Sequence, residues 1–408
     1  MTDAHSSPKP RRAALAFIFV TVALDTLALG MIIPVLPKLV ERVVGGDTAR
    51  AVGIYAVFGT VWAVMQFFFA PVLGALSDRF GRRPVILLSN FGLGLDYVLM
   101  ALAPTLSWLF VGRVLSGIAS ASIATAHAYI ADVTPPERRA RSYGLLGAAF
   151  GIGFVLGPAF GGVLGAIAPR LPFWVAAGFS LANAAYGLLV LPESLPPERR
   201  STFSWRRANP LGSLTLLRSH PELSGLAAAN FLVNLAHVVF PTVFVLFAGY
   251  RFGWDESAVG LSMAMFGLAS IIVQAGLIGP VVAWLGERRA VLVGLSFGTA
   301  GMVMFGLATS AITFCLAILV TALWGFAGAA MQGLMTRRVS AAEQGRLQGA
   351  NSSIVGVANL VGPSIFSVTF AYAINPSRSV ELPGAPFLLA AVMLLGSALV
   401  AWRATRTQ

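Results

Sequence analysis

Long apolar runs alternate with short polar segments along the whole chain. A helix that crosses a bilayer needs about 20 apolar residues, and twelve runs approach or exceed that length. Because backbone groups in hydrocarbon must hydrogen-bond within their own segment, these runs predict helices rather than loops. We expect membrane-spanning helices at residues 13–36, 51–76, 85–104, 106–131, 142–166, 172–191, 223–248, 257–284, 290–309, 312–336, 347–374 and 384–402.

The overall composition agrees with this pattern. The chain is 57% hydrophobic and only 11% charged, with a mean hydropathy of +0.80. A soluble domain usually carries about 25% charged residues, so this chain belongs in a lipid bilayer.

The net charge of +12 by itself suggests nucleic acid as a partner, but its distribution argues against that. The segments between the predicted helices alternate in charge: 21 of the 28 basic residues fall on one side of the membrane and 6 on the other, and Arg113 lies within a helix. By the positive-inside rule, the first side is cytoplasmic, and so are both termini.

The chain also repeats itself at an offset of 205 residues. Gly74 and Gly81 recur as Gly279 and Gly286, and the pair 157–158 recurs as 362–363. This predicts an all-α membrane protein of two pseudo-symmetric six-helix bundles. We expect an N-terminal bundle at 1–191, a cytoplasmic linker at 192–222 and a C-terminal bundle at 223–408.

Three motifs carry a resemblance to a known family. Residues 74–84 read GALSDRFGRRP, a short charged turn between two helices. Residues 109–117 read LFVGRVLSG, with an arginine inside the membrane, and residues 153–162 read GFVLGPAFGG. The three resemble the loop between helices 2 and 3, the helix-4 motif and the antiporter helix-5 motif of the major facilitator superfamily. The resemblance implies the fold of that superfamily.

Further positions look like one branch, the bacterial tetracycline/proton antiporters. They are Leu24-Asp25, Pro34 to Pro37, Met65-Gln66, Asp96-Tyr97, Ala128 to Asp132, Arg251 to Trp254, Gln274-Ala275 and Gln332-Gly333. This implies a proton-coupled exporter of a small amphipathic molecule, tetracycline-like or multidrug, in the bacterial inner membrane. Ala269 and Gly298 stand where that branch carries a histidine and an aspartate. These departures argue against a metal-chelated tetracycline as the substrate.

Asp25, Asp96 and Arg113 are the three clear ionisable residues within predicted helices of the first half. Ionisable groups in a bilayer are costly unless they serve a cavity or a partner. A buried carboxylate can take up and release a proton, whereas arginine stays charged and acts on its neighbours. We therefore expect Asp25 and Asp96 to couple transport to protons, with Arg113 modulating them. The alternative is a structural pair.

Uncharged polar residues within predicted helices are candidates for substrate binding. Asn230, Asn234 and His237 are spaced so that they share one face of a helix. The alternative is that these side chains bond neighbouring helices. The candidates are Gln66, Asn230, Asn234, His237, Gln274, Trp324 and Gln332.

The loop motif and the glycine-rich helix have a mechanical interpretation. Asp78 is expected to face a helix N-terminus of the opposite half, and Arg82 and Asp132 are expected to complete a charge network that holds the cytoplasmic side closed, while Pro158 kinks its helix. The alternative for the arginines is topology alone. The expected gating residues are Gly74, Asp78, Arg79, Gly81, Arg82, Asp132, Gly157 and Pro158.

No nucleophile–base pair, metal cluster or phosphate-binding glycine loop is evident, so we expect neither an enzyme nor a bound cofactor or metal. The expected partners are a small-molecule substrate, protons and the lipid bilayer, with no nucleic acid, and the protein is expected to be a monomer. Two alternatives remain: an uncoupled facilitator or metabolite importer with the same fold, and a membrane receptor without transport.

Overall fold

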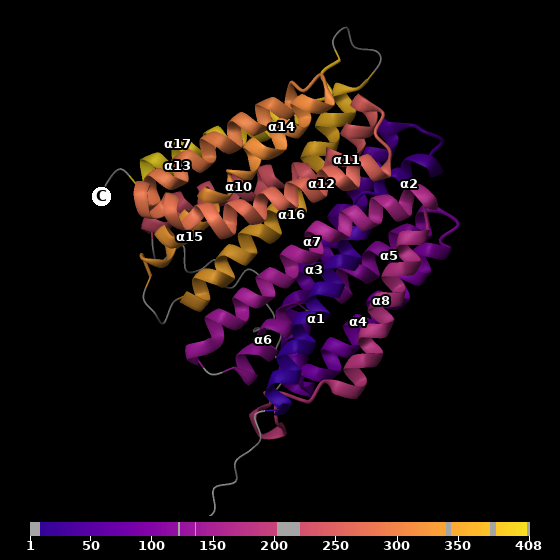
Figure 1. Cartoon of the computed structure of the whole chain (residues 1–408), viewed down its shortest axis with the longest axis vertical. Helices are drawn as coiled ribbons and strands as arrows, with labels where there is room; N and C mark the ends of the chain where they lie inside the picture. The colour runs from indigo at the N-terminus through magenta and orange to yellow at the C-terminus, as the bar shows by residue number, and fades with distance from the viewer. Residues whose placement is uncertain are drawn as a thin grey trace, which may run out of the picture. The chain divides into compact units, whose positions relative to one another are not determined.

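The computed structural model is helical throughout the part of the chain that it describes, residues 9–120, 123–134, 136–201, 221–339, 344–375 and 381–405. Within those ranges there is no strand (Figure 1). The helices of the first half are α1 (Lys9–Ile32), α2 (Leu36–Val43), α3 (Thr48–Phe80), α4 (Arg82–Leu102), α5 (Leu106–Ala119), α6 (Ile123–Val133), α7 (Pro136–Ile167), α8 (Leu171–Val190) and the short 3₁₀ turn η2 (Pro197–Arg199).

The second half is also helical, and its helices are interrupted more often. Its helices are α10 (Pro221–His237), α11 (Val239–Phe252), α12 (Glu256–Ile272), the π-helical turn η4 (Val273–Leu277), α13 (Ile278–Gly306), α14 (Ala311–Ala322), α15 (Gly325–Thr336), α16 (Gln344–Ala373) and α17 (Ala385–Ala404).

The described residues contain nine helical stretches that are long and apolar enough to cross a membrane. One of them, Glu256–Gly306, covers two predicted helices, which part at Gly286, where φ is +74°. Two shorter apolar helices, Leu106–Ala119 and Gly151–Ile167, coincide with two further predictions. Each of the twelve predicted spans thus has a counterpart, and the all-α membrane fold is confirmed.

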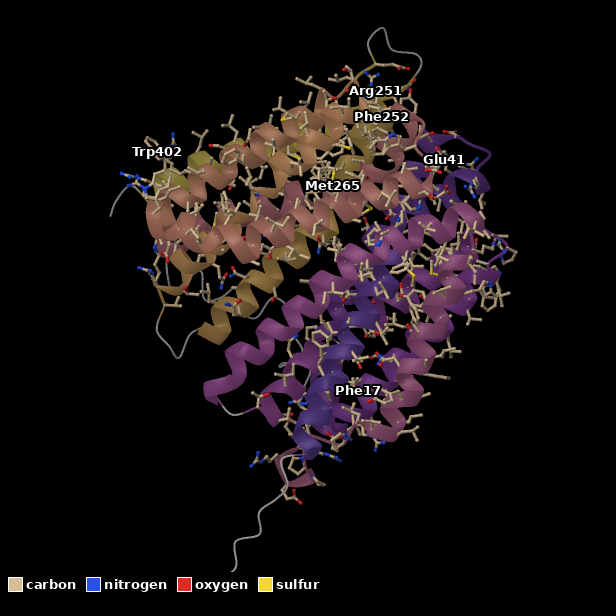
Figure 2. All side chains as sticks on the ribbon, in the orientation of Figure 1. Phe17, Glu41, Arg251, Phe252, Met265 and Trp402 are labelled. Carbon is tan, nitrogen blue, oxygen red and sulfur yellow. The ribbon has the colours of Figure 1, made fainter. Side chains whose placement is uncertain are left out.

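The chain forms two compact units. The first comprises residues 1–32 and 64–209, and the second comprises residues 33–63 and 210–408. In the first unit, α1 packs along α7 and α4 along α8. Phe17 of α1, which Figure 2 labels, is fully buried in this unit. It belongs to an apolar cluster that includes Ile86 and Tyr129.

The core of the second unit is rich in aromatic rings. Phe305 and Phe314 meet edge to face with their centroids 4.8 Å apart, a favoured geometry for aromatic pairs. Residues 33–63 join this unit through α2, whose Arg42 forms an ion pair with Glu256, a buried residue that begins α12. The division at 191 and 222 expected from the sequence repeat remains a prediction.

Candidate functional site

Two carboxylates lie inside the helices of the first unit. Asp25 is in α1, and Asp96 is in α4 with 1% of its surface exposed. No described residue donates a hydrogen bond to Oδ1 of Asp25 or to either carboxylate oxygen of Asp96. Arg113 of α5 is buried and acts electrostatically on Asp96, and Tyr97 lies within electrostatic range of both carboxylates. The fold therefore gathers the three ionisable residues that we expected to couple transport to protons.

Gly112 provides the space for this cluster. A Cβ atom at that position would lie 3.0 Å from Oδ1 of Asp96 and 2.6 Å from Cγ of Met100. The helix of Arg113 can therefore approach α4 closely only because the preceding residue has no side chain.

The surroundings of these carboxylates allow them to change between the protonated and the ionised form. An ionised carboxylate taken out of water without hydrogen-bond donors loses several kcal/mol, which protonation avoids. A nearby guanidinium favours the ionised form instead, so the balance between Asp96 and Arg113 is sensitive to any movement of α4 against α5. This arrangement can hold a proton and release it.

The second unit contains a cavity of about 200 Å³. Four of the seven residues that we expected to bind substrate line it: Asn234, His237, Gln274 and Trp324. Its other lining residues are Val233, Phe266, Ser270, Thr321, Ala322, Gly325 and Gly328.

The cavity lies at three interruptions of helical structure. His237 is the last residue of α10, Trp324 occupies the turn between α14 and α15, and Gln274 is in the π-helical turn η4. At the breaks after α10 and α14, the backbone bonds to the third preceding residue. The N–H of Val238 donates to the Leu235 carbonyl at 3.2 Å, and the N–H of Trp324 donates to the Thr321 carbonyl at 2.9 Å. In a membrane, irregular backbone is tolerated where it is buried in protein or lines a cavity, and π-turns often mark functional sites. The interrupted helices of transporters form binding sites in this way.

Asn230 and Gln332, which we also expected to bind substrate, are absent from the cavity wall but connect to it. Nδ2 of Asn234 donates to the Asn230 side chain, whose own Nδ2 donates to Oδ1 of Asn351 at 3.3 Å. Asn351 in turn donates to Oε1 of Gln332 at 2.9 Å. The sequence interpretation missed Asn351, although an asparagine in the long apolar helix α16 is a signal of the same kind as Asn230. Gln66 is in α3 of the first unit and is not part of this cavity.

The positions of the two branch departures have a structural explanation. Ala269 packs against the small apolar cluster of Val273, Ala322 and Phe326. At Gly298, a Cβ atom would lie 2.9 Å from Cγ of Trp324 and 3.0 Å from Cδ1 of Leu394, so the indole takes up the space of a larger side chain. No group of three or more His, Cys, Asp or Glu side chains in the described residues is placed to hold a metal ion.

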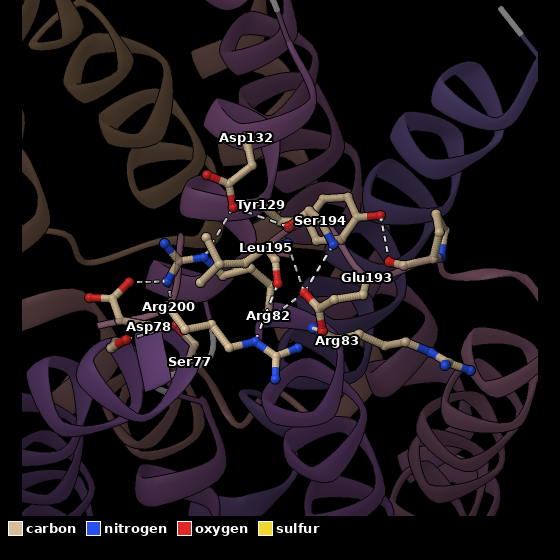
Figure 3. A network of polar contacts seen from close by, with 12 residues as sticks. Ser77, Asp78, Arg82, Arg83, Tyr129, Asp132, Glu193, Ser194, Leu195 and Arg200 are labelled. Carbon is tan, nitrogen blue, oxygen red and sulfur yellow. Dashed lines mark hydrogen bonds and ion pairs between the residues drawn. The ribbon is translucent and has the colours of Figure 1, made fainter. Parts of the chain in front are cut away.

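The charged turn at 74–84, which comprises the end of α3, Gly81 and the start of α4, contains a polar network around Arg82 (Figure 3). Its guanidinium pairs with Asp78 at 2.5 Å and with Asp132 at 3.1 Å, and it donates to Oγ of Ser77 at 2.7 Å. Ser77 in turn donates to the carbonyl of Gly74 at 2.7 Å. Arg82, Asp78 and Asp132 thus form one charge network within the first unit, and its role in closing the cytoplasmic side remains a prediction. Arg79 points elsewhere, with its guanidinium 5.0 Å from the centre of the Phe80 ring.

Glu193 is the second centre of this network, and sequence reasoning missed it. Its Oε1 accepts the backbone N–H groups of Arg82, Ser194 and Leu195, each at 2.9 Å, and its Oε2 accepts that of Arg83 at 3.3 Å (Figure 3). The carboxylate therefore caps the free N–H groups at the start of α4 from more than a hundred residues away.

Gly81 and the segment after α8 complete this network. Gly81 has φ of +107°, and a Cβ atom there would lie 2.3 Å from Oε2 of Glu193. Oγ of Ser194 donates to Asp132 at 3.1 Å, and the hydroxyl of Tyr129 donates to the Pro192 carbonyl at 2.9 Å. The first residues of the expected linker are thus bound to the charged turn.

Glu193→Gln is expected to lower the unfolding free energy by about 1–3 kcal/mol, because charge-assisted bonds from backbone N–H groups are replaced by weaker ones or lost. The measurement is the melting temperature of the purified protein. Glu198→Gln is the matched control, since Glu198 is an exposed carboxylate in the same segment. Equal melting temperatures for both variants would refute the capping role.

Gly157 and Pro158 lie where α7 crosses α1. A Cβ atom on Gly157 would lie 2.7 Å from Cα of Gly30, and one on Gly161 would lie 2.1 Å from the Met31 carbonyl oxygen. Small residues allow the backbones of membrane helices to approach in this way. These positions therefore fix the contact between α1, which carries Asp25, and α7.

The sequence was compared with known protein families and proteins. The Major Facilitator Superfamily profile matches residues 15–363. The tetracycline resistance protein of class C from Escherichia coli is 39% identical over 364 residues, which cover 89% of this chain and 91% of that protein. The class G protein from Vibrio anguillarum is 36% identical over 363 residues, covering 88% and 91% respectively.

Solved structures show the same fold. A bacterial homologue of the human lysosomal transporter Spinster, in an inward-facing and unoccupied conformation, superimposes with a TM-score of 0.77 at 17% identity, covering 98% of both chains. The nucleoside transporter NupG gives 0.77 at 12% identity, covering 97% of this chain and all of the other. Because the superfamily profile spans most of the chain and the helical fold agrees with it, this protein is a member of the Major Facilitator Superfamily of membrane transporters.

Proposed function

We propose that this protein is a proton-coupled antiporter that exports a small, amphipathic, drug-like molecule across the bacterial inner membrane. Two residue sets support the proposal: a carboxylate cluster in the first unit, and an uncharged cavity in the second. The resistance proteins at 36–39% identity support export as the direction of transport.

The observation that carries proton coupling is the state of Asp25 and Asp96. Both lie in apolar helices, and Oδ1 of Asp25 and both carboxylate oxygens of Asp96 accept no hydrogen bond from the described residues. Such groups exchange protons readily when their surroundings change. A proton that enters from outside neutralises one of them and favours one conformation, and its release inside favours the other. Arg113 adjusts this exchange through its charge.

We assign substrate contact to Asn234, His237, Gln274 and Trp324. Asn230 and Gln332 support them through hydrogen bonds, and Gln66 remains a candidate in the first unit. In this proposal a bundle at 1–191 and a bundle at 223–408 alternate about the substrate, joined by a cytoplasmic linker. Both termini are cytoplasmic, and a single chain performs the cycle. The network around Arg82, together with Gly157 and Pro158, controls the change of state.

Proton flux in inverted membrane vesicles tests this proposal. The vesicles are energised by respiration, and a dye sensitive to ΔpH reports proton movement as tetracycline and a panel of cationic and neutral drugs are added. We expect at least one drug to release protons from vesicles that contain the protein and not from vesicles that lack it. Drug transport without proton movement would contradict antiport and favour an uncoupled facilitator.

A further inference from the structure

The hydrogen bonds of the second unit fix the direction in which the Asn234 amide points. Its Nδ2 donates to the backbone carbonyl of Asn230 at 2.8 Å and to the Asn230 side-chain oxygen at 3.0 Å. A backbone carbonyl can only accept, so the NH₂ group of Asn234 must face it. The remaining bonds, from Asn230 to Asn351 and from Asn351 to Gln332, run in the same direction.

One polar atom of Asn234 is left over. Both of its N–H groups are used, whereas its Oδ1 accepts no hydrogen bond from any described residue. Because Asn234 lines the cavity, it offers a fixed acceptor to a ligand that brings a donor. An acceptor left unpaired in a binding site discriminates strongly against ligands without that donor.

Aromatic rings form the wall next to this acceptor. The ring of His237 lies 5.7 Å from that of Trp324 and 5.7 Å from that of Phe240, and Phe266 also lines the cavity. Gly298 faces the Trp324 indole without a side chain of its own. These rings contact one another and together form an aromatic surface against which a flat aromatic ligand can pack.

The wall carries no carboxylate. Its polar groups are the hydroxyls, amides and imidazole of Asn234, His237, Ser270, Gln274 and Thr321, and no Asp, Glu, Lys or Arg is among its described lining residues. Magnesium ions and their complexes are held by carboxylate oxygens, and a buried cation without a counter-charge is costly. The donor set therefore suits an uncharged ligand.

We propose that this cavity selects a planar, uncharged aromatic molecule that bears a hydroxyl donor, that Oδ1 of Asn234 accepts its hydrogen bond, and that no divalent cation takes part. The inference rests on the proposed function in treating the cavity as the substrate site. It names the substrate class of that site and makes Asn234 the residue that determines specificity.

Calorimetric binding to the full chain in lipid nanodiscs tests this inference, with no proton gradient present. The probes are 2,6-dihydroxyanthraquinone and its dimethyl ether, in EDTA and again in magnesium chloride, at a pH that keeps the phenols neutral. In EDTA, we expect the dihydroxy compound to bind about tenfold more tightly, the usual size of one hydrogen bond. Magnesium is expected to leave this ratio unchanged.

Asn234→Leu is expected to abolish the difference between the two probes. Asn351→Ala should preserve it, because the Asn230 backbone carbonyl still orients Asn234. Equal binding of both probes to the unmodified protein, a requirement for magnesium, or a difference that survives in Asn234→Leu would each overturn the inference. If Asn234→Leu fails to fold, the comparison of the two probes on the unmodified protein still tests the inference.

The binding experiment is separable from the transport experiment. Selective binding of the dihydroxy compound without drug-linked proton movement would contradict antiport and support the substrate class. Proton-linked transport of a compound that binds only with magnesium would support antiport and contradict the substrate class.

Discussion

Asp25→Asn and Asp96→Asn are each expected to reduce drug-linked proton release in inverted vesicles to the level of vesicles without the protein. Asparagine has nearly the size of aspartate but cannot carry a proton. A variant locked in the neutral form can bind substrate and change conformation, yet it cannot exchange a proton for it. The measurement is the ΔpH signal on drug addition, with protein amounts matched by immunoblot.

Substrate binding separates coupling from folding in these variants. Neither aspartate lines the cavity of the second unit, so both variants are expected to retain binding of the exported compound. Asp96→Glu restores a titratable group and is expected to recover part of the proton signal. A full proton signal in both asparagine variants would show that neither carboxylate is the carrier.

Gly157→Ala is expected to lower the unfolding free energy by about 2 kcal/mol or more. Its Cβ would lie 2.7 Å from the backbone Cα of Gly30. A backbone atom cannot relieve this clash by a change of rotamer, as a flexible side chain can. The only relief is to part α1 from α7, which also moves Asp25. We expect a lower yield of folded protein, a lower melting temperature and weaker transport, measured on purified protein and in vesicles.

Gly178→Ala is the matched control for this variant. Gly178 lies in α8, and a Cβ atom there would meet nothing within 4 Å. Alanine favours a helix over glycine by about 1 kcal/mol, so the control should melt at the same temperature or slightly higher. If Gly157→Ala melted like the control, the close contact of α1 with α7 would not limit stability.

The expected architecture follows from local features of the sequence. Membrane crossing depends on runs of apolar residues, which can be counted without knowing what they pack against. For the same reason Asp25, Asp96 and Arg113 stand out, because an ionisable residue in an apolar run is conspicuous wherever its partners lie. The charged turn at 74–84 and the glycines at 153–161 are visible in the same way.

The contacts and helix breaks that the sequence did not predict depend on residues far apart in the chain. Glu193 is one of three acidic residues in the expected linker, and only the fold brings it to the first N–H groups of α4, from Arg82 onward. Asn351 acquires its meaning from Asn230, 121 residues earlier. The helix breaks at His237 and Trp324 lie within continuous apolar runs, where hydropathy gives no sign of them.

The sequence alone thus determined that the chain is a bundle of twelve membrane helices with carboxylates in its first half, because the cost of polar groups in hydrocarbon acts residue by residue. Only the tertiary structure decided which side chains meet. It gathered Asp96 with Arg113, bound Glu193 to the charged turn, and placed Asn234 beside His237 and Trp324 in one cavity. Those contacts depend on helix packing and on where helices break, which is a property of the whole fold.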